Sequence, residues 1–166
     1  SRTKITSLPK ELPSELQELI CSQTNLKELP KLPKGLRVLF CTFIPTITEL
    51  PKLPLGLQEF ACSGTSIKKL PHLPEGLKKL YCTDLTISTI PPLPNTLEFA
   101  DFDYTMLRVP FADFYRKYKY TRNMNEFRNS VNKMNEILKR KQNLESLKTM
   151  AKTLPYIGAL TDNVIA

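Results

Sequence analysis

The chain has 166 residues, of which 41% are hydrophobic, and its formal net charge is +8. This length fits one domain or one short repeat array, and no apolar run is long enough to span a bilayer. Residues 1–110 hold 13 Lys or Arg against 11 Asp or Glu, whereas residues 111–166 hold 11 against 5, so the basic character belongs to the C-terminal part. Such a segment can contact nucleic acid or anionic lipid, but solubility is the explanation that we favour.

The first residues, Ser1 to Lys4, contain no apolar segment of the kind found in signal peptides. The chain has no initiator Met and begins within a repeat. We therefore expect a fragment or a processed product, from which a targeting segment could have been removed.

A repeat of 20 or 21 residues fills residues 5–110. Its first leucine column contains Leu16, Leu36, Leu57, Leu77 and Leu97. Another apolar residue follows three positions later in each unit, and a cysteine column two positions after that contains Cys21, Cys41, Cys62, Cys82 and, in the fifth unit, Phe102. A Leu-Pro or Ile-Pro pair closes each unit, and a second Leu-Pro comes shortly after it. Five copies in register predict a stacked repeat array.

Each unit is expected to contain one strand and one extended segment. The second apolar residue and the cysteine are two positions apart, so a strand directs both to one face. The Pro-rich segments, such as residues 29–33, cannot form helices, because proline removes a donor and pushes its preceding residue toward extended geometry. Gly35, Gly56 and Gly76 precede the first leucine, and we expect positive φ there in a tight turn.

With these repeats the chain resembles the leucine-rich repeat family, and its unit is similar to those of secreted bacterial effectors and of some large amoebal viruses. The resemblance covers residues 5–110. It implies an α/β repeat fold: a solenoid with parallel strands on the concave face and an extended, Pro-rich convex side. The family's usual Asn after the strand is replaced by Thr24, Thr65 and Thr105, and the other two units are irregular there. A full asparagine ladder is therefore not expected.

The four cysteines occupy one column of the predicted ladder and are not expected to bind zinc. Neighbouring strands lie about 4.8 Å apart, and four sulfur atoms in a line cannot surround one ion at about 2.3 Å. Parallel side chains in a packed core are also poorly oriented for disulfides. We predict four buried, reduced thiols that act as small apolar residues, which implies a reducing compartment.

The sequence predicts no enzyme and no cofactor. His72, the only histidine, lies in a Pro-rich connection whose equivalent positions hold Lys or Pro, and we expect it to be solvated. One histidine without an adjacent nucleophile gives acid–base catalysis few groups to use. Residues 82–84 (Cys-Thr-Asp) match the C-x-D signature of the ubiquitin ligases attached to similar bacterial repeats, but Cys82 is simply the fourth member of the cysteine column.

Residues beside the inward strand residues are expected to point to the concave face, where we place the candidate binding site. The predicted partner-binding residues are Ile20, Val38, Phe40, Phe43, Lys79, Tyr81, Phe99 and Tyr104. Exposed aromatic clusters usually mark an interaction surface. A partner or the chain's own tail could cover these residues, or they could merely be scattered over the surface; the sequence favours neither partner binding nor coverage by the tail. Phe40, Phe43 and Tyr81 flank the small residues Ala61 and Gly64, which predicts a shallow trough between aromatic ridges.

Residues 111–166 predict a basic helical tail. Aromatic residues at 111, 114, 115 and 118 have helical spacing and are expected to cap the last repeat. An amphipathic helix is predicted over 124–138, with Asn123 as its N-cap and the basic residues 139–141 at its end. Asn143 is expected to cap a further helix that ends at Pro155. The predicted division is a solenoid of about five repeats, residues 1–110, and a helical cap, residues 111–166; two heptads are too few to assign an oligomeric state.

The leading hypothesis is a protein–protein interaction module that binds through its concave face. The resemblance to effectors implies a host protein as partner and a cytoplasmic location, the host cytosol. One alternative is binding of nucleic acid or an anionic surface through the basic tail, for which residues 115–122 supply a small basic face with stacking aromatics. Another is that the chain is the substrate-recognition part of a larger enzyme, such as a ubiquitin ligase.

Overall fold

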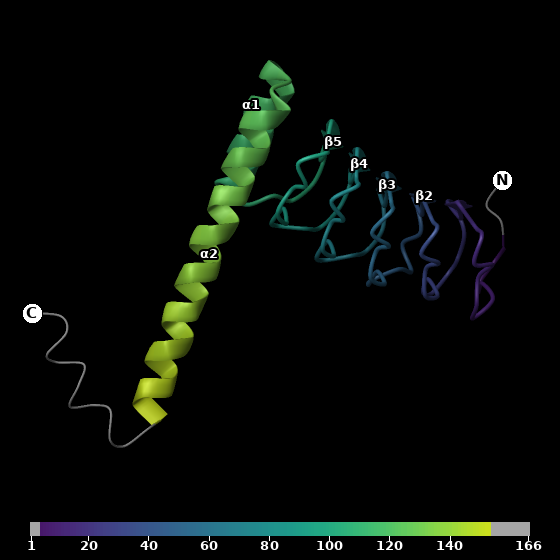
Figure 1. The fold of residues 1–166 in the computed structure, drawn as a ribbon, viewed down its shortest axis with the longest axis horizontal. Helices are drawn as coiled ribbons and strands as arrows, with labels where there is room; N and C mark the ends of the chain where they lie inside the picture. Colours follow the sequence, from purple (N-terminus) through teal and green to yellow (C-terminus); the bar gives the residue numbers. More distant parts are fainter. Residues whose placement is uncertain (1–3, 154–166) are drawn as a thin grey trace, which may run out of the picture. The chain divides into compact units, whose positions relative to one another are not determined.

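The computed structural model describes the backbone of residues 4–153 and the side chains of residues 4–150. In this part of the chain, five short parallel strands form one sheet in the order of the sequence (Figure 1). The strands are β1 (Glu18–Ile20), β2 (Val38–Phe40), β3 (Glu59–Ala61), β4 (Lys79–Tyr81) and β5 (Phe99–Asp101). Two helices follow, α1 (Phe111–Thr121) and α2 (Met124–Thr153). Among the described residues, no helix is long and apolar enough to cross a membrane.

The repeat spacing sets the register of the sheet. Equivalent residues pair from strand to strand, so that Leu39 lies opposite Phe60 and Phe60 lies opposite Leu80. These central residues are fully buried, whereas most of the residues on either side of them are only half-buried. The cysteine column continues the ladder, since the Cys41 N–H donates to the Ala61 carbonyl at 2.9 Å. The predicted solenoid of parallel strands is confirmed.

The Pro-rich return of every repeat makes the same turn before the next strand. The N–H of the first leucine donates to the carbonyl of the proline three residues earlier, as between Leu36 and Pro33 at 3.2 Å. Leucines of the return, such as Leu32 and Leu53, are buried. Burial of these leucines explains why an extended segment without regular hydrogen bonding stays attached to the core.

The prediction of positive φ for the glycines at positions 35, 56 and 76 is wrong. Among the described residues, the glycine with positive φ is Gly64 (φ 63°). The turn glycines instead lie close to the preceding repeat, because a β carbon on Gly76 would lie 3.2 Å from the Leu55 carbonyl oxygen. In the fifth repeat Thr96 takes this place, and its hydroxyl donates to a carbonyl of the preceding repeat 2.9 Å away. Close approach between neighbouring turns therefore accounts for Gly76, whereas a β carbon on Gly35 or Gly56 would make ordinary contacts, at 3.4 and 3.7 Å.

Three repeats have threonine where the family usually has asparagine, and each threonine makes a local hydrogen bond. The Thr24 hydroxyl donates to the Cys21 carbonyl at 2.8 Å, and Thr65 and Thr105 make the same bond to the residue three positions earlier, at 2.7 and 2.6 Å. Each bond closes the bend that directly follows the strand. Thr24 and Thr65 are buried, so these hydroxyls satisfy carbonyl groups that water does not reach.

Asn123 caps α2 as predicted, because its side-chain oxygen accepts a hydrogen bond from the Glu126 N–H at 3.1 Å. The helix then continues without interruption to Thr153. The predicted end at residues 139–141 and the predicted cap at Asn143 are therefore wrong. Lys and Arg are good helix formers, and residues 139–143 contain neither Gly nor Pro to end the helix. The predicted end at Pro155 lies outside the described residues.

The described residues fall into two compact units, one that ends at Asn132 and one that begins at Lys133. The first unit contains the repeats, α1 and the first turns of α2. In the second unit, α2 carries exposed Leu144 and Leu147 and an ion pair between Lys148 and Glu145 at 3.3 Å. The division after residue 110 stays a prediction, while the first compact unit also includes helical residues up to 132.

Aromatic residues of the first unit cover the C-terminal end of the repeat core. Phe102, the fifth member of the cysteine column, packs edge-on against Tyr115 of α1, with ring centroids 5.6 Å apart, and against Phe127 of α2 at 6.4 Å. Tyr118 stacks on Phe127 at 4.9 Å. All four rings are buried, so these residues shield the apolar core that a last repeat leaves open.

Polar side chains at the start of α2 satisfy the backbone of the last repeat. The Asn132 side chain accepts a hydrogen bond from the Leu93 N–H at 2.7 Å and donates to the Leu93 carbonyl at 3.0 Å. The buried Arg128 donates to the Leu97 carbonyl. Unpaired buried backbone groups are costly, and these two side chains supply hydrogen bonds that a further repeat would otherwise make.

Candidate binding face

Six predicted site residues lie on the strands, beside neighbours that are more deeply buried. We call them the strand-face residues: Ile20, Val38, Phe40, Lys79, Tyr81 and Phe99. Ile20 is 64% exposed and the other five are half-buried, whereas Leu39 and Leu80 between them are fully buried. This alternation places the strand-face residues on the side of the sheet opposite to the core. Their role in binding a partner stays a prediction.

Neighbouring repeats contribute two contacts between side chains on this face. The Lys79 ammonium group lies 2.8 Å from the Glu59 carboxylate, and this hydrogen bond raises the pKa of Lys79. The rings of Tyr81 and Phe99 lie side by side, with centroids 5.3 Å apart and a tilt of 43°. The face therefore offers an aromatic pair next to an ion pair, both built from adjacent strands.

The residues two positions after the cysteine column share a left-handed backbone. We call them the left-handed column: Gln23, Phe43, Gly64, Asp84 and Tyr104, with φ between 54° and 63°. Gly and Asp tolerate this conformation, but a bulky aromatic residue rarely adopts it. Phe43 is nevertheless 52% exposed and Tyr104 is 88% exposed. Two aromatic side chains therefore stand at an unfavourable backbone position without being buried.

The predicted trough is largely filled. A β carbon on Gly64 would lie only 2.8 Å from Cδ1 of Phe43, so the Phe43 ring occupies the space beside this glycine. Ala61, the other small residue, is only 5% exposed. The expected hollow between aromatic ridges is wrong at Gly64, because the aromatic ring of one repeat lies over the glycine of the next.

Helix α1 contacts the fifth repeat at Asp101, the last residue of β5, and at Asp103 two residues later. The Tyr115 hydroxyl donates to carboxylate oxygens of Asp101 and Asp103, at 2.9 and 3.0 Å, and the Lys119 ammonium group lies 2.7 Å from Asp103. The hydrogen bond from Lys119 lowers the pKa of Asp103, and burial raises the pKa of Tyr115. The tail thus engages two carboxylates of this face, while Phe43 and Tyr104 remain exposed.

The basic segment 115–122 offers less to nucleic acid than the sequence suggested. Of the three tyrosines in this segment, Tyr115 and Tyr118 are buried against the last repeat, whereas Tyr120 is 85% exposed. Three of its basic side chains form ion pairs: Lys117 with Glu126, Lys119 with Asp103 and Arg116 with Asp113. Base stacking requires a free aromatic face, so these two tyrosines are not available for it.

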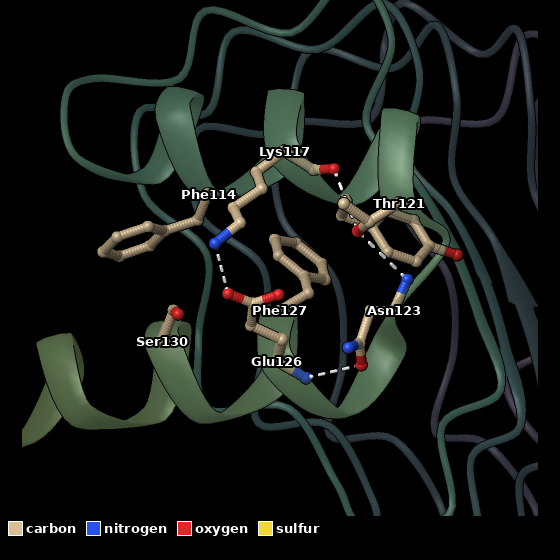
Figure 2. Close-up of a pocket in the computed structure, with 8 residues that line it drawn as sticks. Phe114, Lys117, Thr121, Asn123, Glu126, Phe127 and Ser130 are labelled. Carbon is tan, nitrogen blue, oxygen red and sulfur yellow. Dashed lines mark hydrogen bonds and ion pairs between the residues drawn. The ribbon is translucent and has the colours of Figure 1, made fainter.

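A small cavity of about 170 Å³ lies where α1 meets the first turns of α2 (Figure 2). Figure 2 shows Lys117 reaching from α1 to Glu126 on α2, with Phe127 between the helices. Asn123 lies at the same end and holds the first turn of α2 through its bond to the Glu126 N–H. The side chains around this cavity pair with one another, which is consistent with a helix junction rather than a ligand site.

The cysteine column has the chemistry of a packed core. All four thiols are free and buried, and the Cys62 and Cys82 sulfur atoms lie 3.5 Å apart. Burial raises the pKa of Cys21 to about 11 and that of Cys62 well above its usual value, so these groups are poor nucleophiles at neutral pH. His72 is exposed, as expected. Among the described residues, no three His, Cys, Asp or Glu side chains are placed to hold a metal ion.

The short parallel strands, the buried leucine columns and the Pro-rich returns define a leucine-rich repeat solenoid followed by two helices. No family model and no curated protein matches the chain. The leucine-rich repeat domain of a Shigella effector is similar, with 30% identity and a TM-score of 0.63 over 66% of this chain and 50% of that one. YopM from Yersinia enterocolitica is 34% identical, with a TM-score of 0.60 over 63% of this chain and 23% of that one.

The chain is therefore a leucine-rich repeat protein whose repeats are similar to those of bacterial effectors. It spans half of the Shigella domain and less than a quarter of YopM, with shares of 50% and 23%.

Two features, one of the site and one of the C-terminal cap, were missed from sequence. The left-handed column was detectable, because Gly64 and Asp84 share a column and both residue types favour positive φ. The hydrogen bonds of Arg128 and Asn132 could not be predicted from sequence, because a polar residue on a helix does not indicate which distant carbonyl it will bind.

Proposed function

We propose that this chain is a protein–protein interaction module of the effector type, which binds a host protein through the strand-face residues and the left-handed column. The observation that carries this proposal is the exposure of Phe43 and Tyr104 at left-handed backbone positions. Bulky residues there cost stability, and these two recover little of it by burial. Binding a partner would bury Phe43 and Tyr104, and aromatic anchors of this kind usually dominate the binding energy of an interface.

The proposed mechanism is binding without chemistry. Phe43, Tyr104 and Ile20 supply exposed apolar area from three different repeats. The Tyr81–Phe99 pair forms a firm aromatic surface, because each ring is supported by its neighbour. The ion pair between Lys79 and Glu59 lies partly exposed beside this surface and serves specificity more than affinity.

A host cytosol is the compartment in which this module would act. Four buried free thiols suit a reducing environment, and one of the similar structures is the leucine-rich repeat domain of a Shigella effector. The same repeats are compatible with the substrate-recognition part of a larger protein, because the chain covers only 50% and 23% of the similar chains. Whether the module acts alone or as part of a larger protein, we propose that its repeats bind the partner or substrate.

The test is affinity capture from mammalian and amoebal cell lysates, with quantification by mass spectrometry. The variant combines Phe43→Gly with Tyr104→Asp, which are residues that the left-handed column already contains at other repeats. We expect the variant to lose the captured partner and to melt at or slightly above the wild-type temperature, because the strained backbone positions are relieved.

The matched control is Tyr120→Gln, which removes an aromatic residue that is 85% exposed on α1, outside both groups of site residues. This control should capture the partner as wild type does. Capture that survives in the double variant, or that is lost equally in the control, would contradict the proposed site.

A further inference from the structure

A second recess lies on the Pro-rich returns, away from the strands. It has a volume of about 670 Å³ and lies between the returns at residues 31–34 and 51–55. We call it the lysine groove; besides two prolines, it is lined by Lys31, Lys34, Lys52, Leu32, Leu53 and Leu55. Its lining is apolar at the leucines and prolines and positively charged at the lysines.

Leu55 departs from the repeat pattern in this groove. It is 80% exposed, and the equivalent positions of the other repeats hold the polar residues Ser14, Lys34, Glu75 and Asn95. The fold therefore does not require an apolar side chain here. Its exposure leaves apolar area in contact with water, which burial against another molecule would remove.

The side chains of the three groove lysines form no ion pair in the described part of the chain, while the backbone of Lys31 pairs with Glu11 in an isolated parallel bridge. Among the described residues, none that lines the groove is acidic. The feature is local to these two returns, because the next return carries His72 and Glu75 at the positions of Lys52 and Leu55. The groove thus combines an exposed leucine with a cluster of unpaired positive charge.

We propose that the lysine groove binds a segment of a partner protein in which one or two apolar side chains are flanked by carboxylates. The apolar side chain would pack on Leu55 and the neighbouring prolines, and the carboxylates would pair with Lys31, Lys34 and Lys52. This site is separate from the strand face and does not rest on the function proposed above.

An acidic peptide fits the groove better than an anionic membrane does. A recess of about 670 Å³ can receive an inserted side chain. Membrane attachment by charge needs a broad basic surface, whereas residues 1–110 are nearly balanced, with 13 basic and 11 acidic residues. Three of the ten lysines of residues 1–110 line this one groove, which favours a local, directional ligand.

The experiment is selection of a bead-bound library of random octapeptides on the full chain, in parallel with a groove variant. The variant carries Leu55→Asn and Lys34→Glu, both of which occur at this column in other repeats, and a second variant carries Leu55→Asn alone. Thermal melting checks that each variant is folded. Phe43→Gly serves as the control, because it alters the left-handed column and leaves the groove intact.

We expect wild type and the Phe43→Gly control to enrich peptides with Leu, Ile or Phe between Asp and Glu. The consensus peptide, fluorescently labelled, should bind the double groove variant at least about tenfold more weakly than wild type, as expected when an anchor and a charge partner are lost. Higher salt should weaken binding to wild type.

Three results would overturn the proposal: no enriched peptide, a consensus without carboxylates, or equal affinity for wild type and both groove variants. Co-sedimentation with vesicles of phosphatidylcholine and phosphatidylserine tests the lipid alternative. Vesicle binding by wild type that the groove variants lose, without peptide binding, would assign the groove to a membrane surface and would also overturn the proposal.

Discussion

Phe43 and Gly64 illustrate how single residues of adjacent repeats depend on one another. Both have positive φ, and the Phe43 ring lies where a side chain at position 64 would be. The exposed ring is thus supported by a glycine from the next repeat. A larger residue at position 64 would both strain the backbone and displace the ring.

We predict that Gly64→Ala destabilises the protein by about 1–2 kcal/mol, mainly because an L-residue is disfavoured in the left-handed region. Urea denaturation of wild type, Gly64→Ala, Phe43→Ala and the double variant measures this cost. The cost of Gly64→Ala should be smaller in the Phe43→Ala background, where the clash is absent. An unchanged free energy of unfolding in Gly64→Ala would contradict the assigned conformation.

Cys62 tests the structural role of the cysteine column. The residue is fully buried and lies 3.5 Å from the Cys82 sulfur atom. We predict that Cys62→Ser destabilises the fold by about 1–3 kcal/mol, because a hydroxyl is buried there without an assured partner, and that zinc content does not change. Elemental analysis that finds stoichiometric zinc in wild type and none in the variant would refute this account.

At the scale of elements, α1 is attached to the last repeat by a polar contact as well as by aromatic packing. Asp103 accepts hydrogen bonds from Tyr115 and Lys119, and the bond from Lys119 lowers its pKa. A carboxyl group whose pKa is lowered on folding stabilises the fold above its unfolded pKa of about 3.9. This stabilisation is lost as the pH falls through the lower, folded-state pKa.

We predict that Asp103→Asn lowers the free energy of unfolding by about 1 kcal/mol at pH 7 and that the difference from wild type shrinks below about pH 4. The matched control is Asp113→Asn, since Asp113 forms only an exposed ion pair within α1, with Arg116 at 2.9 Å. Denaturation at pH 7 and pH 3 makes the comparison. A pH-independent difference for Asp103→Asn would show that its charge does not hold α1 in place.

The elements also show where sequence patterns were sufficient. The parallel strands follow from five copies of one pattern, and the cap at Asn123 follows from a local motif. The wrong helix end at 139–141 came from reading basic residues as a stop signal, although nothing in residues 139–143 breaks a helix. The prediction of positive φ at the turn glycines was wrong because glycine also allows close approach between neighbouring repeats, as at Gly76, which the sequence of a single repeat does not reveal.

At the scale of the whole molecule, the repeats depend on helical residues for their C-terminal end. Phe127, Arg128 and Asn132 of α2 contact the last repeat and belong to the same compact unit as the solenoid. The sequence predicted a cap but could not say how much of the tail takes part. Such long-range contacts depend on the assembled fold and not on any local pattern.

We predict that a chain ending at residue 110 aggregates, because it exposes Phe102 and the unpaired backbone at Leu93. A chain ending at residue 132 should instead remain folded and melt cooperatively, since it keeps the whole first unit. Size-exclusion chromatography and calorimetry on the two truncations provide the comparison. A monomeric, cooperatively melting 1–110 chain would show that the helices are a separate module.

The central claim is that the concave face binds a protein partner, and the most direct measurement is the affinity of a captured partner for a strand-face variant. Phe40 and Tyr81 are half-buried beside the fully buried Leu39 and Leu80, so their loss should leave the core in place. We predict that Phe40→Ala combined with Tyr81→Ala weakens binding, measured by isothermal titration calorimetry, more than about 30-fold. The melting temperature should fall by only a few degrees, roughly the effect of 1 kcal/mol. A folded double variant with wild-type affinity would contradict the claim.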